Sequence, residues 1–175
     1  DVLTSRGLGD VYKRQFYLQA ANVGDSGCIV GSRERGWQTL TYAHRLTDLA
    51  ERDRLRKLAG VQLRDGEKRL YGLSLSRALG DRLFKNEETG LSAEPHVSES
   101  VSVTASADSP VFAVLASDGL WDYVSEKRVA ELVEEIGAAT EGSPEAISGV
   151  LLEQAAANRS GDDVTVCVVR LGGGD

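Results

Sequence analysis

The first apolar positions of the chain have the pattern of paired strands. An apolar run covers residues 16–23, a Gly-Asp-Ser-Gly turn follows at residues 24–27, and residues 28–30 resume the apolar run. Two strand-like runs separated by a tight turn predict a β-hairpin. A third strand is expected over residues 37–42.

In the next segment, the spacing of apolar residues changes from that of a strand to that of a helix. Asp48 and Glu51 have the spacing of a capping box, the following apolar positions fall on one helical face, and Gly60 ends the predicted helix. Residues 61–95 are mostly polar, basic and interrupted by glycine, so we expect them to form an excursion from the core. The basic residues of the predicted helix are expected to form a solvated face: Arg52, Arg54, Arg56 and Lys57.

The second half of the chain is more regular. Residues 111–116 form an unbroken apolar run, which predicts a strand buried on both faces. Ser125 begins a helix that is expected to end at Gly137, and Ser143, followed by proline, begins another. Residues 164–169 are rich in β-branched side chains and are expected to form a central strand. Runs of strands and helices in this order favour an α+β sandwich over a regular βαβ repeat.

Length and composition restrict the class of protein. A chain of 175 residues is the size of one domain, and no apolar run approaches the roughly 20 residues of a membrane span. Residues 1–15 show neither helical nor strand periodicity, and we leave them unassigned, as a tail, a linker or a sequencing artefact. The predicted domain therefore comprises residues 16–175. The chain lacks methionine even at position 1, which indicates a piece of a longer protein.

The charge and the cysteine content limit which binding partners and which cellular compartment we expect for this protein. Asp and Glu number 27 against 20 Lys and Arg, and a net charge of −7 disfavours nucleic acid as a partner. Two cysteines are too few for a disulfide scaffold, and no signal-peptide pattern opens the sequence. We expect an intracellular protein, cytoplasmic or nuclear, without a membrane partner and monomeric when complete.

Three aspartates lie beside glycine at the ends of predicted strands: Asp25, Asp118 and Asp162. If the two strands of the second half are antiparallel neighbours, Asp118 and Asp162 come close together. Asp122 follows Asp118 by four residues, so a helical turn would place both carboxylates on one face. Each aspartate alone is also an ordinary turn residue, but three together favour a shared site.

Carboxylates this close repel one another unless cations neutralise them. All-oxygen ligation favours hard ions, Mg²⁺ or Mn²⁺. Two such ions can activate a bridging water for attack on phosphorus, so the implied chemistry is metal-assisted hydrolysis.

Two rival motifs are weaker. The Gly-Asp-Ser-Gly turn is similar to the nucleophile loop of chymotrypsin-like proteases, but the histidines, His44 and His96, follow the serine instead of preceding it. Cys28 and Arg33 have the order of a cysteine-phosphatase loop without its spacing, so Cys28 is expected to be a buried strand residue. Neither histidine is assigned a role.

Five sequence blocks in one order carry a resemblance to a known family. They are A-N-V-G-D-S-G from Ala21, L-S-L-S-R-A-L-G-D from Leu73, E-P-H-V from Glu94, L-A-S-D-G-L-W-D from Leu115 and S-G-D-D-V-T-V from Ser160. The chain thereby resembles the PPM-type (type 2C) metal-dependent protein serine/threonine phosphatases, over residues 16–171.

The resemblance implies a fold, a reaction and a set of metal ligands. The fold would be a sandwich of two antiparallel β-sheets flanked by helices. A centre of two Mg²⁺ or Mn²⁺ ions would hydrolyse phosphoserine and phosphothreonine in phosphorylated protein substrates. Asp118 and Asp162 would be ligands of that centre, and Asp25, Asp118 and Asp122 would surround a third, weaker metal. Residues 45–80 would correspond to the flap beside the active site.

The sequence also departs from the family pattern. Gly27, Ala43 and Asp163 stand where the family usually has arginine, aspartate and asparagine. The N-terminal acidic pair, the phosphate-binding arginine and the D-G-H-G-G block of the family have no counterpart here, so no catalytic residue beyond the metal ligands and no substrate-binding residue is identified. We therefore expect a phosphatase as the parent protein and little or no activity in this piece alone. The alternatives are a non-catalytic phosphatase-like binding or regulatory module and a two-metal nuclease, which the negative charge disfavours.

Overall fold

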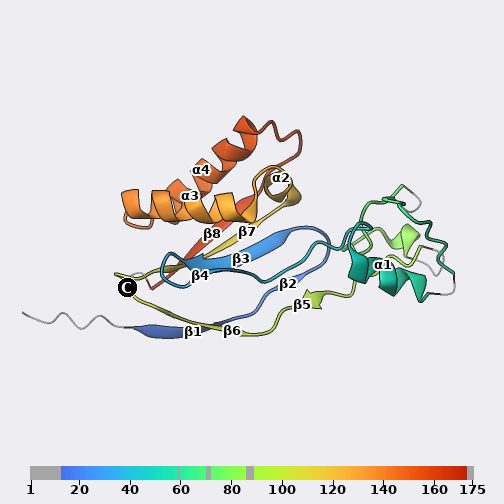
Figure 1. Cartoon of the computed structure of the whole chain (residues 1–175), viewed down its shortest axis with the longest axis horizontal. Helices are drawn as coiled ribbons and strands as arrows, with labels where there is room; N and C mark the ends of the chain where they lie inside the picture. Colours follow the sequence, from blue (N-terminus) through green and yellow to red (C-terminus); the bar gives the residue numbers. More distant parts are fainter. Residues whose placement is uncertain (1–12, 59, 70–71, 86–88, 173–175) are drawn as a thin grey trace, which may run out of the picture.

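A four-stranded antiparallel sheet forms the centre of the computed structural model (Figure 1). Its strand order is β4–β3–β7–β8, in which β3 and β7 are central and β4 and β8 are edges. The strands are β3 (Gly27–Ser32), β4 (Gly36–Thr39), β7 (Val111–Ala116) and β8 (Val166–Leu171). The structure describes residues 13–58, 60–69, 72–85 and 89–172.

Two helices, α3 (Glu126–Ala139) and α4 (Pro144–Ala157), cover one face of this sheet. Both begin as predicted, because Ser125 and Ser143 accept hydrogen bonds from backbone N–H groups of the first turn. Side chains of alternate strand positions meet the helices in one core, which includes Ile29, Phe112, Val114, Leu132 and Leu151.

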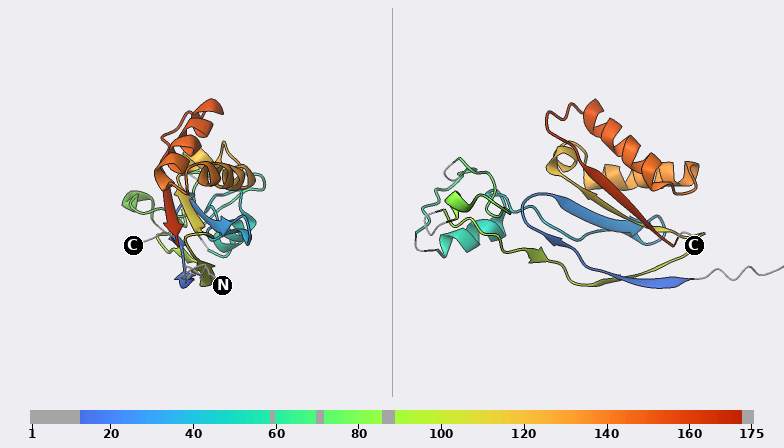
Figure 2. Two further views of the ribbon diagram at one scale, coloured as in Figure 1. Left: turned by 90° about the vertical axis from the view of Figure 1, so that its left-hand side faces the viewer. Right: turned by 180° about the vertical axis from the view of Figure 1, so that it is seen from behind.

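The opposite face of the sheet packs against two short ladders, as the end-on view in Figure 2 shows. The remaining strand positions, among them Cys28, Val30 and Ala113, join Val103 in a second core. The sandwich of antiparallel sheets flanked by helices is therefore confirmed. The ladders pair β1 (Arg14–Leu18) with β6 (Val101–Ala105), and β2 (Ala21–Asn22) with β5 (His96–Val97).

The predicted excursion lies at one end of the sandwich, on the right of Figure 1. It contains α1 (Leu49–Arg56) and a 3-10 turn, η1 (Arg82–Phe84), and the buried side chains of Leu46 and Leu55 give it a small core of its own. A short helix, α2 (Asp118–Trp121), lies directly after β7.

Two predictions about strand pairing are wrong. The strand before the Gly-Asp-Ser-Gly turn does not form a hairpin with β3, because β2 pairs with β5 while β3 pairs with β4 and β7. Both faces of β3 carry apolar side chains that have to be buried in a core. This requirement favours a central position in the larger sheet, which has a core on each face. β8 is an edge strand and not a central one. A β-branched run therefore did not indicate a central position.

Three smaller expectations also need correction. The helix α3 does not end at Gly137 but continues to Ala139, with Gly137 beside the ring of Phe112. Arg52 is buried at 8% exposure instead of solvated, because its guanidinium donates to the backbone carbonyls of Leu46, Arg64 and Glu67. The predicted helix end at Gly60 is also late, since α1 ends at Arg56.

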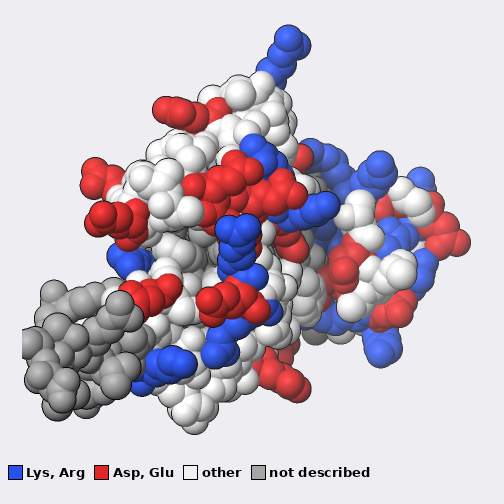
Figure 3. All heavy atoms as spheres, turned by 60° about the vertical axis from the view of Figure 1, so that its left-hand side comes forward, with Lys and Arg blue, Asp and Glu red and all other residues white. Residues whose placement is uncertain are grey.

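Charges of both signs lie together on one face of the molecule. On the face drawn in Figure 3, Lys and Arg side chains are interspersed with Asp and Glu side chains, and acidic groups crowd its centre. In the part of the chain that the structure describes, no helix is long and apolar enough to cross a membrane.

Candidate metal centre

The turn between β2 and β3 presents Asp25 at one end of the central sheet. Gly24, with φ +111°, has a backbone conformation that favours glycine. Its carbonyl accepts from the backbone N–H of His44 at 2.9 Å, and its own N–H donates to His44 Nδ1 at 3.1 Å. Burial and the charge of Arg77 hold the pKa of His44 below its usual value, so the neutral ring is the acceptor. The turn carrying Asp25 is therefore held in place by a buried histidine.

The helix α2 presents Asp118 and Asp122 at the same end of the sheet. Asp122 N–H donates to the carbonyl of Asp118 at 2.9 Å, so the predicted helical turn places both carboxylates on one face. The segment before β8 packs against α2, because Ser117 Oγ donates to the Asp163 carbonyl at 3.2 Å and accepts from Thr165 N–H at 3.1 Å.

The carboxylates of Asp25, Asp118 and Asp122, which we call the acidic cluster, meet around the guanidinium of Arg45. Nε and Nη2 of Arg45 donate to Asp25 Oδ2 at 2.8 and 2.7 Å. Nη1 donates to Asp122 Oδ1 at 2.8 Å, and Nη2 lies 3.3 Å from Asp118 Oδ2. Two separate segments, the turn before β3 and the helix α2, thus bring three negative charges to one cation. The sequence predicted that these aspartates would come together but did not predict Arg45 among them.

Asp162 lies near the acidic cluster but is not one of the carboxylates that pair with Arg45. The strands β7 and β8 are antiparallel neighbours, as predicted, and Asp162 precedes β8. Its Oδ1 accepts from the backbone N–H of Asp163 at 2.8 Å. Burial raises the pKa of Asp118, and the charges of Asp25, Asp162 and Asp122 raise it further, whereas Arg45 lowers it. Asp162 is therefore close enough to contribute to the negative field at Asp118.

The donor atoms of the acidic cluster suit a hard cation, since all are carboxylate oxygens. The arrangement itself is not a preformed metal cage. Within the described ranges, no group of three or more His, Cys, Asp or Glu side chains has a geometry that could hold a metal ion. The hydrogen bonds to Asp122 and Asp25 raise the pKa of Arg45, so it stays charged.

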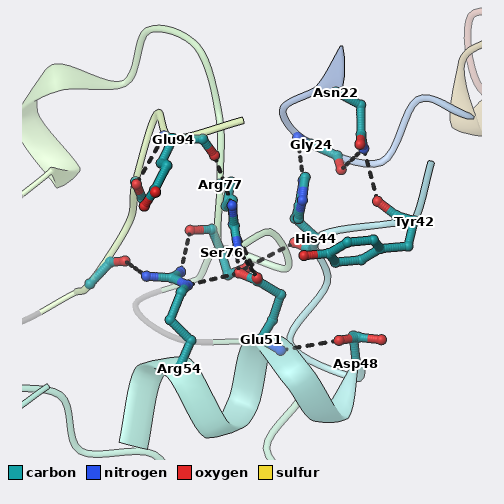
Figure 4. A network of polar contacts seen from close by, with 12 residues as sticks. Asn22, Gly24, Tyr42, His44, Asp48, Glu51, Arg54, Ser76, Arg77 and Glu94 are labelled. Carbon is teal, nitrogen blue, oxygen red and sulfur yellow. Dashed lines mark hydrogen bonds and ion pairs between the residues drawn. The ribbon is translucent and has the colours of Figure 1, made fainter. Parts of the chain in front are cut away.

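Sequence reasoning missed a buried ionic network behind this site (Figure 4). Glu51, at 1% exposure, accepts from Arg77 Nη2 at 2.5 Å, from Ser76 Oγ at 2.5 Å and from Arg54 Nε at 3.0 Å. Burial alone would raise the pKa of Glu51, but hydrogen bonds from Arg77 and Ser76 and the charge of Arg54 outweigh it and lower that pKa to about 2. In the sequence, Ser76 and Arg77 stood out through the block starting at Leu73 and Glu51 through its capping-box spacing from Asp48, but neither signal predicted that they pair.

Comparisons with known proteins identify one family for this chain. The sequence profile of the family described as "Protein phosphatase 2C" matches residues 4–164. "Protein phosphatase 2C 70" of Arabidopsis thaliana is 43% identical over 157 residues, which cover 88% of this chain and 26% of that protein. "Protein phosphatase 2C homolog 1" of Saccharomyces cerevisiae is 37% identical over 163 residues, which cover 93% of this chain and 52% of that protein.

A solved structure supports the same assignment at the level of the fold. A phosphatase from a pathogenic strain of Toxoplasma gondii superposes with a TM-score of 0.75 at 25% identity, covering 88% of this chain and 48% of that one. The chain thus spans about half the length, or less, of the relatives that it matches. The family profile covers most of the sequence. The chain belongs to the protein phosphatase 2C family.

Proposed function

We propose that the protein containing this chain is a metal-dependent protein serine/threonine phosphatase that hydrolyses phosphoserine and phosphothreonine in protein substrates. The observation that carries the proposal is the convergence of Asp25, Asp118 and Asp122 on one cation, in a chain of this family. A centre of two Mg²⁺ or Mn²⁺ ions, with Asp118 and Asp162 among its ligands, would activate water for attack on phosphorus. Asp25, Asp118 and Asp122 would surround a third, weaker metal.

The same fold is found in a protein that was solved with metal ions. The catalytic domain of the phosphatase PstP was solved in complex with two manganese ions, and its fold matches with a TM-score of 0.52 at 20% identity. At that identity the likeness concerns the fold alone, so the proposed metal dependence and its ligand set rest on the family and on the residues of this chain.

We further propose that this chain by itself has little or no activity. Its sequence contains no D-G-H-G-G block, which the resemblance associates with bridging two metals. Its acidic cluster is paired with Arg45. These observations also favour a second candidate, a phosphatase-like module that binds phosphorylated targets without hydrolysing them.

The test is Mn²⁺-dependent hydrolysis of a phosphothreonine peptide by three proteins: this chain, a longer form extended upstream, and the longer form carrying Asp118→Asn. We expect activity only in the unaltered longer form, and a loss of at least about a hundredfold with Asp118→Asn, since a metal ligand contributes several kcal/mol to the barrier. Activity in the short chain would contradict our proposal that it is inactive. An inactive longer form that still binds the phosphopeptide would favour the binding module.

A further inference from the structure

Arg45 is held in the acidic cluster by its own backbone. Its neighbour His44 donates its N–H to the Gly24 carbonyl at 2.9 Å, and its other neighbour Leu46 donates to the Ser74 carbonyl at 3.0 Å. Arg45 itself forms an isolated antiparallel bridge with Leu75. Both neighbouring side chains are buried, at 0% and 1% exposure. The chain is therefore fixed on both sides of Arg45, and the position of its side chain does not depend on a freely moving loop.

The guanidinium uses all of its nitrogen atoms on the acidic cluster. Nε, Nη1 and Nη2 each donate to a carboxylate, and one nitrogen serves two of them. The side chain is only 29% exposed, so solvent replaces few of these contacts. A planar fork of donors matched to carboxylates is the arrangement in which arginine binds most firmly.

A divalent cation and this guanidinium compete for the same three carboxylates. A metal ion binds carboxylate oxygens at about 2.0–2.6 Å and needs several of them at once. The guanidinium already lies within 2.7–3.3 Å of one oxygen of each carboxylate. A doubly charged ion placed between these oxygens would meet both the atoms and the positive charge of Arg45.

We propose that Arg45 is a resident cation of the acidic cluster, and that a divalent metal ion binds to Asp25, Asp118 and Asp122 only by displacing it. Arg45 is then the residue that sets metal affinity at this position in this chain. The inference rests on the proposed metal-dependent function, since it concerns the same carboxylates.

The test measures metal binding directly, without reference to activity. Mn²⁺ is titrated into this chain and the free ion is followed by electron paramagnetic resonance. Arg45→Gln should bind Mn²⁺ at the acidic cluster about tenfold more tightly than the unaltered chain, because no hydrogen bonds to arginine have to be broken. Arg45→Lys keeps the charge but loses the fork of donors, so its affinity should fall between the two.

A second arginine provides a matched control for the loss of a positive charge. Arg56 pairs with Asp53 and Asp65 on the surface and has no bond to the acidic cluster. Arg56→Gln should leave Mn²⁺ affinity unchanged. If it tightens binding as much as Arg45→Gln does, general charge and not displacement is responsible, and the proposal is overturned.

The remaining outcomes separate this inference from the proposed function. If Asp118→Asn weakens Mn²⁺ binding but neither Arg45 variant strengthens it, the resident cation is refuted and the metal site stands. If Asp118→Asn has no effect on Mn²⁺ binding, the proposed metal-dependent function fails, and the inference fails with it. Should Arg45→Gln not fold, Arg45→Lys decides alone: about threefold tighter binding supports displacement, and unchanged binding overturns it.

Discussion

Glu51 joins two segments of the excursion, α1 and the segment containing Ser76 and Arg77, through a single buried carboxylate. Its partners Arg77 and Ser76 lie 26 and 25 residues away in sequence, and Arg54 lies one turn further along α1. A buried carboxylate is tolerated only when its hydrogen bonds are satisfied, and here both oxygens are engaged. The ion pair with Arg77 therefore holds α1 against the strand-like segment that also bridges to Arg45.

We expect Glu51→Gln to lower the free energy of unfolding by about 3 to 5 kcal/mol, because it leaves the buried guanidinium of Arg77 without a counter-charge. Urea unfolding at pH 7 measures this. Asp53→Asn is the control, since Asp53 is 67% exposed and pairs with Arg56 at 3.6 Å on the surface, where such pairs contribute about 0–1 kcal/mol. Equal effects of the two substitutions would contradict the role given to the buried pair.

The same pair determines a dependence on pH. The pKa of Glu51 is lowered in the folded chain from 4.5 to about 2, so the folded state binds its proton less readily than the unfolded state does. The stabilisation is complete above pH 4.5 and is lost as the pH falls toward 2. The difference in unfolding free energy between the unaltered chain and Glu51→Gln should therefore be constant from about pH 5 to 7 and shrink in acid. A difference that does not change below pH 4.5 would assign the acid sensitivity to other groups.

At the scale of elements, the site depends on how closely α2 approaches the segment that leads into β8. A Cβ atom added to Gly119 would lie 2.5 Å from the carbonyl oxygen of Asp163, and backbone atoms cannot move aside without shifting the chain. Ser160 Oγ also donates to the Gly119 carbonyl, at 2.9 Å. The glycine next to Asp118 therefore permits the contact that brings Asp162 toward the acidic cluster.

Gly119→Ala should destabilise the chain by about 1 to 3 kcal/mol through overpacking. Gly149, in the middle of α4, is the matched control because a Cβ there meets nothing within 4 Å. Gly149→Ala should stabilise the chain by up to about 1 kcal/mol, as alanine does in an open helical position. Thermal and urea unfolding of both variants measure the contrast, and a Gly119→Ala variant as stable as the unaltered chain would disprove the close packing.

At the scale of the whole molecule, one side of the central sheet is incompletely covered. Leu115 lies in register with Cys28 on one side and Cys167 on the other, and Leu115 and Val169 remain 42% and 41% exposed. Together with Leu18 and Leu40 they line a hollow of about 650 Å³ between the sheet and the ladders. Exposed apolar surface of this kind binds hydrophobic dyes.

The folded chain should therefore bind the dye ANS, and replacing both Leu115 and Val169 by threonine should remove most of the fluorescence. Leu83, on η1, is 92% exposed but lies outside the hollow. Leu83→Thr should leave the fluorescence unchanged. If Leu83→Thr lowers it as much as the double variant does, the dye does not report on the hollow.

Local patterns predicted the second half of the chain well. The strand 111–116 and the first turns of α3 and α4 lie where apolar runs and N-cap serines placed them. Such signals depend on residues within one or two turns of each other, so they can be read from the sequence. Strand pairing was predicted less well, because the neighbour of β2 and the edge position of β8 depend on how whole faces of the sheet are covered.

The sequence by itself determined the family, the α+β class and which aspartates come together: Asp25, Asp118 and Asp122. These depend on block order, on periodicity and on residue type at strand ends. Only the tertiary structure decided that Arg45 lies among those aspartates and that Glu51 is buried with Arg77. The partners of Arg45 are 20, 73 and 77 residues distant in sequence, so no local pattern could reveal them. The physical reason is that two oppositely charged side chains form an ion pair only when folding brings them within hydrogen-bond distance of each other.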